Sequence, residues 1–534
     1  MATLTLSNSF ENDWPPNALG GGVIVSRTAT TMTYTSELGY TVTLRGTGFT
    51  YDADGMPSGG TVTRTTIALG GLTYADFTGV SVDFGRAGML IFGFDRDNGN
   101  HQNPDPFAFQ EIMLRGNDLV NGSNGNDDIH AGTGNDTINT GAGGDYIDGE
   151  AGNDVMNGGA DWDTLSFEDA NWRWEAFRGV NLDALTGVAL DPFGFTDSFT
   201  NFERYKDTLY SDTLKGSNID HEEFVINRGN DLVDGRGGFD RVDYSEADNW
   251  GAHRGITVNL ATGIVVDSWK GTDTLINIES VIGTIFNDRM TGNAGHNEFL
   301  SGRGIDTIDG AGGTDRIAFW NIHNDVGSHG IVVNLNLATE VVDDGFGNAE
   351  NANNIEDVFG SNFNDRIIGN GIINDLFGEG GNDTISGGGG EDFLGGGWGS
   401  DVIFGGGGNN DHIDGGGDND TLTGNGGNDN FNFGWDLADA GVDTVTDFDG
   451  SIDLIHIASW WGGGFVNDTL VAGQFRSGAG VTTANLASQR VIYNTTTGDL
   501  FFDADGNGVG FAAVKFATLS NLATLTFDDI HVML

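Results

Sequence analysis

The chain has 534 residues, of which 23 are basic and 78 acidic, giving a formal net charge of −55. A surface this acidic repels nucleic acid and anionic membranes and attracts divalent cations. Hydrophobic residues make up 37% of the chain and Phe occurs 35 times, which favours a packed core over acidic disorder. Cysteine is absent, so in an extracellular protein bound metal would replace disulfides as the stabilising cross-link.

Residues 1–114 are predicted to form a small N-terminal β domain. Strand-like runs at 40–44, 61–63 and 89–94 are separated by Gly and Asp, a pattern that favours a small β-sandwich. The first eight residues have no basic n-region and no apolar h-region, so they do not match a conventional signal peptide. No apolar run approaches the length of a transmembrane segment.

A nonapeptide with the frame G-x-D-x-apolar follows, and its first block occupies 115–166. A fixed nonapeptide of this kind is typical of the calcium-binding parallel β-helix, in which single units bury their apolar residue only by stacking. Stacking brings carboxylates together, and their repulsion disfavours folding until a divalent cation bridges them. The predicted calcium ligands of this block are Asp118, Asp127, Asp136, Asp145, Asp154 and Asp163.

The nonapeptide recurs in three later blocks, each preceded by an irregular β-rich insert. We expect an insert and its block over each of 167–240, 241–315 and 316–434, with a one-residue slip at 409–410. Asn297, Asn374 and Glu222 replace the expected Asp, which makes calcium doubtful at those turns. The predicted ligands of the three blocks are Asp231 and Asp240; Asp288, Asp306 and Asp315; and Asp365, Asp383, Asp392, Asp401, Asp411, Asp420 and Asp429.

A second period, of about 76 residues, runs through the inserts. Glu203, Glu279 and Glu356 each follow an apolar residue at this step, and the Asp of the sequence Asp-Thr-Leu at 212–214 is matched at 288 and 365. The strand-like runs of the inserts are short and β-rich. We therefore interpret each insert as a wider coil of the same solenoid.

Residues 435–534 are predicted to form a C-terminal β cap. The runs 491–493 and 500–502 flank a turn and are expected to pair as a hairpin. A solenoid needs an atypical end to cover its last coil, and this segment fits that requirement.

Over most of 116–534 the chain resembles the RTX (repeats-in-toxin), hemolysin-type calcium-binding proteins of Gram-negative bacteria. The last segment is similar to the domain that follows the repeats in serralysin-type members, through Asp447-Phe448, the run 498–501 and the run Asp503-Ala-Asp505-Gly-Asn507. The resemblance implies that this end is an uncleaved signal for type I secretion. It also implies that two nonapeptides make one right-handed coil, with Asp118, Asp136 and Asp154 on one edge and Asp127, Asp145 and Asp163 on the other.

Other candidate sites have simpler explanations. The run 503–507 suits a calcium loop, but a hairpin turn explains it equally well. His221-Glu222-Glu223 lacks the second His of a zinc protease, and no G-x-S-x-G elbow occurs, so no catalytic site is predicted. Six Trp residues in the inserts and cap could stack on sugars, but we favour burial at coil ends. They are Trp172, Trp174, Trp250, Trp269, Trp460 and Trp461.

The sequence thus predicts an all-β chain, a right-handed parallel β-roll or β-solenoid that binds several Ca²⁺ ions. Turn-type calcium sites with dissociation constants of about 10⁻⁴–10⁻³ M fill only outside cells, which favours a secreted or cell-surface protein of a Gram-negative bacterium. We expect a non-enzymatic adhesin, surface-layer or biofilm component, with calcium, the type I secretion machinery and surface glycan or another copy as partners. The alternative is an extracellular polysaccharide or ester hydrolase whose repeats serve secretion and stability.

Overall fold

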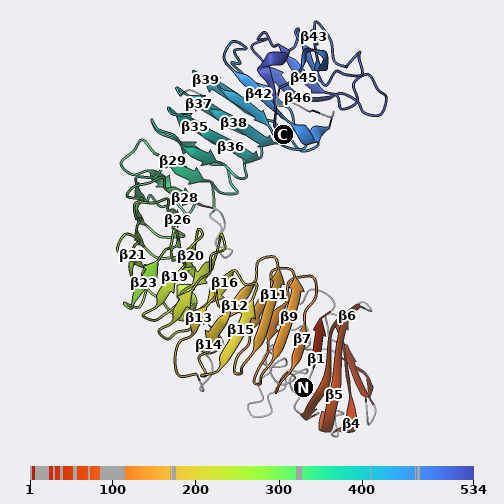
Figure 1. The fold of residues 1–534 in the computed structure, drawn as a ribbon, viewed down its shortest axis with the longest axis vertical. Coiled ribbons are helices and arrows are strands. Elements are labelled where there is room, and N and C mark those ends of the chain that lie inside the picture. The colour runs from red at the N-terminus through yellow and green to blue at the C-terminus, as the bar shows by residue number, and fades with distance from the viewer. Residues whose placement is uncertain are drawn as a thin grey trace. The chain divides into compact units, whose positions relative to one another are not determined.

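The computed structural model describes residues 3–6, 23–27, 31–35, 40–51, 57–69, 72–83, 114, 116–168, 170, 176–319, 328–408, 410–462, 465 and 469–533. The chain divides into two compact units. The first comprises Met1–Trp250 with Gly263–Ile278, and the second comprises Gly251–Thr262 with Glu279–Leu534. Strands predominate in both units (Figure 1).

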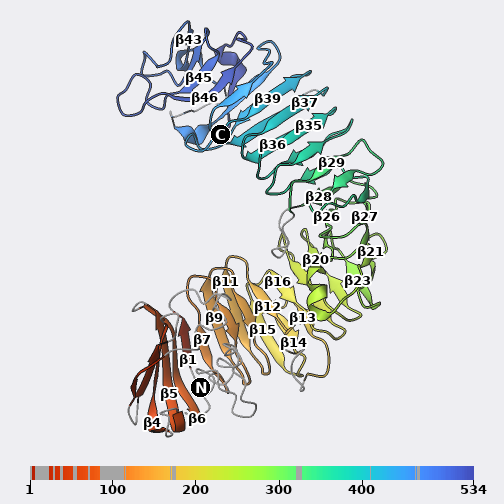
Figure 2. The same cartoon turned by 180° about the vertical axis from the view of Figure 1, so that it is seen from behind.

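The N-terminal strands of the first unit form one antiparallel meander. They are β2 (Val23–Arg27), β3 (Thr31–Thr35), β4 (Tyr40–Tyr51), β5 (Pro57–Leu69) and β6 (Leu72–Asp83), and β1 (Thr3–Leu6) pairs antiparallel with β6. β1 also pairs in parallel with β7 (Leu119–Asn121), the first repeat strand, as Figure 2 shows.

The predicted sandwich stays a prediction, because part of residues 1–114 lies outside the described residues. Within the described residues, β1–β6 belong to one sheet, and β1 joins that sheet to the solenoid. The physical reason is that the first repeat strand has an open edge, which β1 covers with backbone hydrogen bonds. The predicted strand at 89–94 lies outside the described residues.

Two parallel sheets make the repeat region of the first unit. Partners lie 18 residues apart, as in Leu119 opposite Thr137 in one sheet and Asp128 opposite Tyr146 in the other, so two nonapeptides make one coil, as predicted. The apolar residue of each unit points inward and is at most 1% exposed, as at Ile138. The strands are β7, β9 (Thr137–Ala142) and β11 (Val155–Ala160) in one sheet, and β8 (Asp128–His130), β10 (Tyr146–Asp148) and β12 (Thr164–Ser166) in the other.

The inserts of the first unit continue both sheets. Val155 of β11 pairs with Ser198 of the first insert, and a hairpin, β14–β15, projects from this wider coil. The second insert repeats the arrangement with β22 and β23 on β19. These elements are β13 (Asn181–Asp183), β14 (Val188–Leu190), β15 (Thr196–Thr200), β16 (Arg204–Lys206), β17 (Thr213–Lys215), β18 (Glu223–Val225), β19 (Leu232–Asp234), β20 (Arg241–Asp243), β22 (Ile264–Val266), β23 (Thr272–Ile276) and the 3-10 helix η2 (Ser245–Trp250).

The second unit is built in the same way. Its parallel strands again pair mostly at a step of two nonapeptides, and β29–β30 is the hairpin of the third insert. They are β21 (Thr257–Asn259), β24 (Ser280–Ile282), β25 (Arg289–Thr291), β26 (Glu298–Leu300), β27 (Thr307–Asp309), β28 (Arg316–Ala318), β29 (Val332–Asn334), β30 (Val341–Asp343), β31 (Asn351–Asn353), β32 (Asp357–Phe359), β33 (Arg366–Ile368), β34 (Asp375–Phe377), β35 (Thr384–Gly388), β36 (Phe393–Trp398), β37 (Val402–Gly406), β38 (His412–Gly417), β39 (Thr421–Asn425) and β40 (Asn430–Phe433).

The C-terminal segment covers the last coil. β44 and β45 form the predicted hairpin, while β46 stacks in parallel on β41 and β47 on β42. Trp461 packs against Phe502 and Phe516, with ring centroids 5.4 and 5.3 Å away, whereas Trp460 is 61% exposed. The elements are β41 (Asp443–Val445), β42 (Leu454–Ala458), η3 (Ser459–Trp461), η4 (Ala472–Gln474), β43 (Phe475–Gly478), β44 (Val491–Asn494), β45 (Asp499–Phe502), β46 (Val514–Leu519), η5 (Phe527–Asp529) and β47 (Ile530–Met533).

Burial of Trp at coil ends is thus observed at Trp461 and not at Trp460. Trp250 and Trp269 are half-buried, while Trp172 and Trp174 lie outside the described residues.

Candidate metal centre

Each predicted calcium ligand lies in the turn just before a parallel strand, and each is at most 3% exposed. The alternation of strands between sheets places them along two edges, as the resemblance implied. In the first unit one edge carries Asp118, Asp136, Asp154 and Asp231, and the other carries Asp127, Asp145, Asp163 and Asp240; in the second unit one edge carries Asp288, Asp306, Asp365, Asp383, Asp401 and Asp420, and the other carries Asp315, Asp392, Asp411 and Asp429. We call these residues the ladder aspartates.

Most ladder aspartates use one carboxylate oxygen to hold the preceding coil. The backbone N–H of Asp118 donates to Oδ1 of Asp136 at 2.6 Å, and the N–H of Asp136 donates to Oδ1 of Asp154 at 2.7 Å. The same bond recurs in the second unit, where Asp365 donates to Asp383 at 2.7 Å. The ladder therefore fixes the coil register through charge-assisted hydrogen bonds.

The slip in the fourth block leaves the ladder intact. Asp392 donates its N–H to Oδ1 of Asp411 at 3.0 Å, across 19 residues instead of 18. Asn410 absorbs the extra residue with φ of 64°, a conformation that Asn tolerates better than most residues.

The second carboxylate oxygen has no protein partner at many of these positions. Oδ2 is buried and accepts no hydrogen bond from the described residues in Asp136, Asp154, Asp163, Asp306, Asp315, Asp383, Asp392, Asp401 and Asp411. A buried anionic oxygen left without a donor costs several kcal/mol, on the order of the desolvation of a charged group. Oxygen atoms in this position are the ligands that Ca²⁺ selects.

The pKa values of the ladder aspartates reflect the same lack of hydrogen-bond donors. Burial, with the neighbouring carboxylates of Asp154 and Asp118, raises the pKa of Asp136 to about 8. Burial likewise raises the pKa of Asp383 to about 8, with contributions from Asp365 and Asp401. A bound divalent cation would lower both pKa values, because it compensates the negative charges of the carboxylates.

Several turn positions have room for glycine and for no larger residue. A Cβ on Gly152 would overlap the carbonyl oxygen of Gly134 in the preceding coil, and a Cβ on Gly378 would overlap Oδ2 of Asp383. Glycine therefore lets turn carbonyls and ladder carboxylates approach each other closely, as a shared cation requires.

The two Asn positions still donate their N–H to the next ladder aspartate but supply no carboxylate oxygen. Asn374 donates its N–H to Oδ1 of Asp392 at 3.0 Å, and its side-chain amide donates to the carbonyl of Glu356 at 2.8 Å. Asn297 makes the same contact with the carbonyl of Glu279 at 3.4 Å. The amide thus satisfies a turn carbonyl that a cation could otherwise bind, which agrees with the doubt about calcium at these turns.

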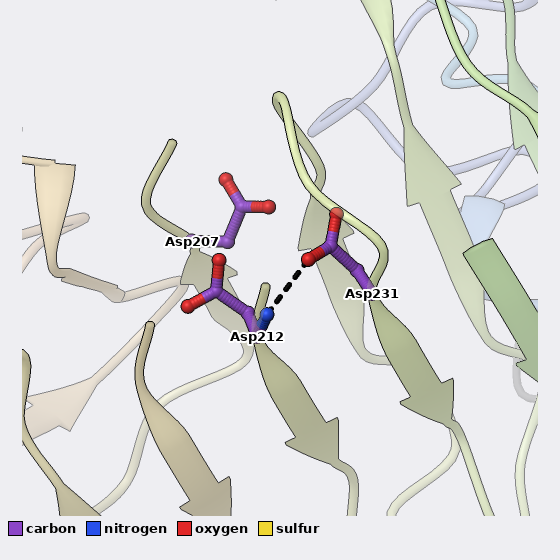
Figure 3. Close-up of side chains that lie close together, drawn as sticks. All are labelled: Asp207, Asp212 and Asp231. Atoms are coloured by element: carbon purple, nitrogen blue, oxygen red, sulfur yellow. Dashed lines mark hydrogen bonds between the residues drawn. The ribbon is translucent and has the colours of Figure 1, made fainter. Parts of the chain in front are cut away.

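One group of three carboxylates is close enough for a single ion among the described residues. One oxygen from each of Asp207, Asp212 and Asp231 lies within 4.8 Å of the others, and all three residues are buried (Figure 3). Asp212 donates its N–H to Oδ1 of Asp231 at 2.7 Å, so both belong to one edge of the ladder. Burial, with Asp212 and Asp273 nearby, raises the pKa of Asp231 to about 9.

Sequence reasoning missed Asp207 and left Asp212 out of the ligand set. Asp207 precedes Asp212 by five residues, the place that Gly283 and Gly360 take before their own ladder aspartates. A Cβ on Gly283 would lie 2.6 Å from Oδ2 of Asp288, which shows how close that position is to the carboxylate. An alignment of the copies of the 76-residue repeat would have shown that Asp207 adds a carboxylate where the other copies have Gly283 and Gly360.

Residues 504–507 form a turn, as the hairpin explanation of this run expects. Asp503 is 3% exposed, and Oδ2 of Asp505 accepts the N–H groups of Gly510 at 2.8 Å and Phe511 at 3.2 Å, so hydrogen bonds within the loop occupy this oxygen.

The sequence model of the RTX calcium-binding nonapeptide repeat matches residues 114–138, 139–171, 279–318, 359–394, 368–403, 377–410 and 405–436. The chain carries RTX repeats. RTX repeats bind Ca²⁺, and the matched ranges contain the ladder aspartates of blocks one, three and four. Asp231 and Asp240 lie outside the matches but have the same ladder geometry. A search of curated proteins finds no match.

Proposed function

We propose that this RTX protein is secreted and folds when extracellular calcium binds the ladder. The observation that carries the proposal is the run of buried Oδ2 atoms without protein partners, as in Asp136 and Asp383. Without a cation these stacked carboxylates oppose folding, so calcium binding free energy becomes folding free energy. At cytoplasmic calcium levels the chain would remain unfolded and competent for export.

Circular dichroism in chelator, followed by calcium addition, tests the coupling. We expect the β signal to be lost in chelator and restored by millimolar Ca²⁺. Mg²⁺ at the same concentration should not restore it, because Mg²⁺ demands octahedral geometry and keeps its waters. A β signal that survives chelation would contradict the proposal.

Export by a type I system is supported by the resemblance of the C-terminal sequence to serralysin-type members; there β47 ends one sheet, and β46 continues the other into β45, β44 and β43. Among the described residues, no helix has the length and apolarity to cross a bilayer. Expression in a Gram-negative host with and without a type I apparatus tests the route. Full-length chain should accumulate in the medium only when the apparatus is present, and equal release in both hosts would contradict it.

For the extracellular role we propose adhesion to surface glycan, without catalysis. Phe393 and Trp398 of β36 are 42% and 54% exposed. Phe393 stacks on His412 at 4.6 Å and Trp398 packs edge-on against Trp435 at 4.7 Å, so both rings are held in place at the surface. Ordered, exposed aromatic faces suit sugar stacking.

Glycan binding by the calcium-loaded chain and by Trp398→Ala tests this role. Adhesion predicts binding that falls at least severalfold in the variant, while Trp460→Ala, also at an exposed Trp, serves as the control.

Electron microscopy separates a self-assembled layer, which would show sheets or filaments, from dispersed adhesin. Turnover of polysaccharide or ester substrates by the same preparation would instead favour the hydrolase.

A further inference from the structure

Asp207 places a carboxylate at a position that the other copies of the 76-residue repeat give to glycine. The copies have Gly283 and Gly360 there, and Asp207 comes five residues before Asp212. The ranges matched by the RTX repeat leave out residues 172–278. The nonapeptide therefore does not account for this carboxylate, and a separate reason for its presence is needed.

Both oxygens of Asp207 accept hydrogen bonds from N–H groups. Oδ1 accepts the backbone N–H of Asn227 at 3.0 Å and its side-chain amide at 2.9 Å, and Oδ2 accepts the same backbone N–H at 2.9 Å. In Asp212, Oδ1 accepts the N–H of Val180 at 2.5 Å and Oδ2 accepts that of Thr208 at 3.3 Å. N–H donors on both oxygens favour the ionised carboxylate, because protonation would place an O–H donor among them. The hydrogen bonds thus favour two negative charges side by side.

No basic side chain among the described residues pairs with these carboxylates. Lys206 precedes Asp207 in the chain, but its Nζ contacts Glu168 and Glu246 instead, at 2.9 Å each. The third carboxylate, of Asp231, lies next to the other two (Figure 3). Its Oδ2 is buried and accepts no hydrogen bond from the described part of the chain. Three buried carboxylates without a positive partner indicate a bound cation.

We propose that Asp207, Asp212 and Asp231 bind one calcium ion that is taken up at lower calcium concentrations than the ions of the rest of the ladder, an inference that rests on the proposed calcium-dependent folding. One oxygen of each residue lies within 4.8 Å of the others. Two oxygens bound to one Ca²⁺ at about 2.3–2.6 Å are at most about 5 Å apart, so this spacing suits a shared ion.

The third carboxylate gives the reason for tighter binding. Calcium affinity is tuned by the number of charged ligands and by the rigidity of the site. Neighbouring ladder aspartates such as Asp365 and Asp383 bring two carboxylates together, whereas the site at Asp207 brings three. Because each coil of a solenoid contacts only its neighbours, an ion bound here would fold the surrounding coils before the other repeats.

Hydrogen exchange of the full chain at increasing free calcium tests this order. In the wild type, β17 and β19, which follow Asp212 and Asp231, should become protected at a calcium concentration about tenfold or more below that of β35 and β37. Asp207→Asn keeps an acceptor for Asn227 but removes the charge, so the two midpoints should converge. Equal midpoints in the wild-type chain would overturn the proposal.

Two further variants complete the exchange experiment. Asp207→Gly restores the residue of the other copies and should also bring the midpoints together, while circular dichroism in saturating calcium should show that both Asp207 variants fold. Asp220→Asn, at an exposed turn residue of the same unit, should leave both midpoints unchanged. A difference between the midpoints that persists in both Asp207 variants would overturn the proposal.

Equilibrium dialysis separates this site from the folding proposal. At the calcium concentration that protects β19 and not β35, the wild-type chain should hold one ion and Asp207→Asn should hold none. A β signal that persists in chelator would overturn calcium-dependent folding, and dialysis would still report whether this site binds. Equal calcium contents of the two chains would overturn the site alone. They would indicate that the acids share protons, since burial and the charges of Asp212 and Asp231 raise the pKa of Asp207.

Discussion

At the residue scale, the two oxygens of a ladder aspartate have different tasks. Oδ1 accepts the N–H of the preceding coil, as in the bond of 2.7 Å from Asp365 to Asp383, and Oδ2 stays available for a cation. At Asn374 the side-chain oxygen accepts the N–H of Asn370 at 2.8 Å, four residues earlier, and the amide donates to the carbonyl of Glu356 at 2.8 Å, so no charged oxygen is left for a cation. An Asp→Asn substitution therefore keeps an acceptor oxygen and removes the charge.

Asp383→Asn should keep the fold in saturating calcium but weaken calcium binding. The amide still offers an acceptor oxygen, but it carries no charge for the cation, and charge-assisted contacts are worth about 1.5–3 kcal/mol. We expect at least a tenfold higher calcium concentration at the folding midpoint, measured by circular dichroism. Glu391→Gln, at an exposed side chain in the same block, should leave the midpoint unchanged.

Gly152→Ala should destabilise the first unit by about 2 kcal/mol or more, because the new Cβ would overlap the carbonyl of Gly134 and the coils would have to separate. Thermal unfolding in excess calcium measures the loss. Gly426→Ala is the control, since a Cβ there meets nothing within 4 Å. Equal effects of the two substitutions would contradict the close packing of the turns.

The metal-free fold should gain stability as the pH falls. The pKa of Asp136 lies near 8 in the fold, compared with 3.8 for an ordinary Asp, so the folded form binds more protons than the unfolded chain in this window. The free energy of unfolding in chelator should therefore decrease as the pH rises from about 4 to about 8. Calcium affinity should change in the opposite direction and increase with pH, because protons compete for the same oxygens. The fraction of folded chain in chelator at several pH values, measured by circular dichroism, reports the first trend.

At the element scale, short strands gain stability only through their neighbours. Strands of three residues such as β8 and β10 bury one apolar side chain each, so a coil without a covered edge would be unstable. β1 covers the start of one sheet, and β46 and β47 cover the ends of both. Non-repeat sequence at both ends is thus a physical requirement of the repeat.

Trp461→Ala should loosen the C-terminal cap by about 3–5 kcal/mol, the usual effect of removing a buried large aromatic. Its ring lies between Phe502 and Phe516, and its Nε1 donates to the carbonyl of Trp435 at 2.6 Å. Amide hydrogen exchange over β45 and β46 should accelerate. Trp460→Ala, at the exposed neighbour, should leave the exchange rates unchanged, and equal acceleration in both variants would contradict the assigned packing.

At the scale of the whole molecule, the net charge of −55 and the buried ladder aspartates both make the folded state depend on bound cations. Each unit places rows of carboxylates in its interior edges, where water cannot compensate them. Folding is therefore expected to depend on the calcium of the surroundings, and the same chain can be unfolded in one compartment and rigid in another.

The sequence by itself determined the nonapeptide ladder, its calcium and the all-β fold, because a strict period of nine fixes which residues face inward and which lie in turns. The tertiary structure decided the rest. The contact of β1 with β7, the closeness of Asp207 to Asp212 and the placing of Asp197 beside Asp154 join residues whose separation follows no period of nine. Such contacts depend on how wider coils stack, and stacking is set by backbone pairing in three dimensions. For this reason the ladder could be predicted from the spacing of its aspartates, whereas the place of Asp207 beside the ladder became visible only after folding had brought it to the edge.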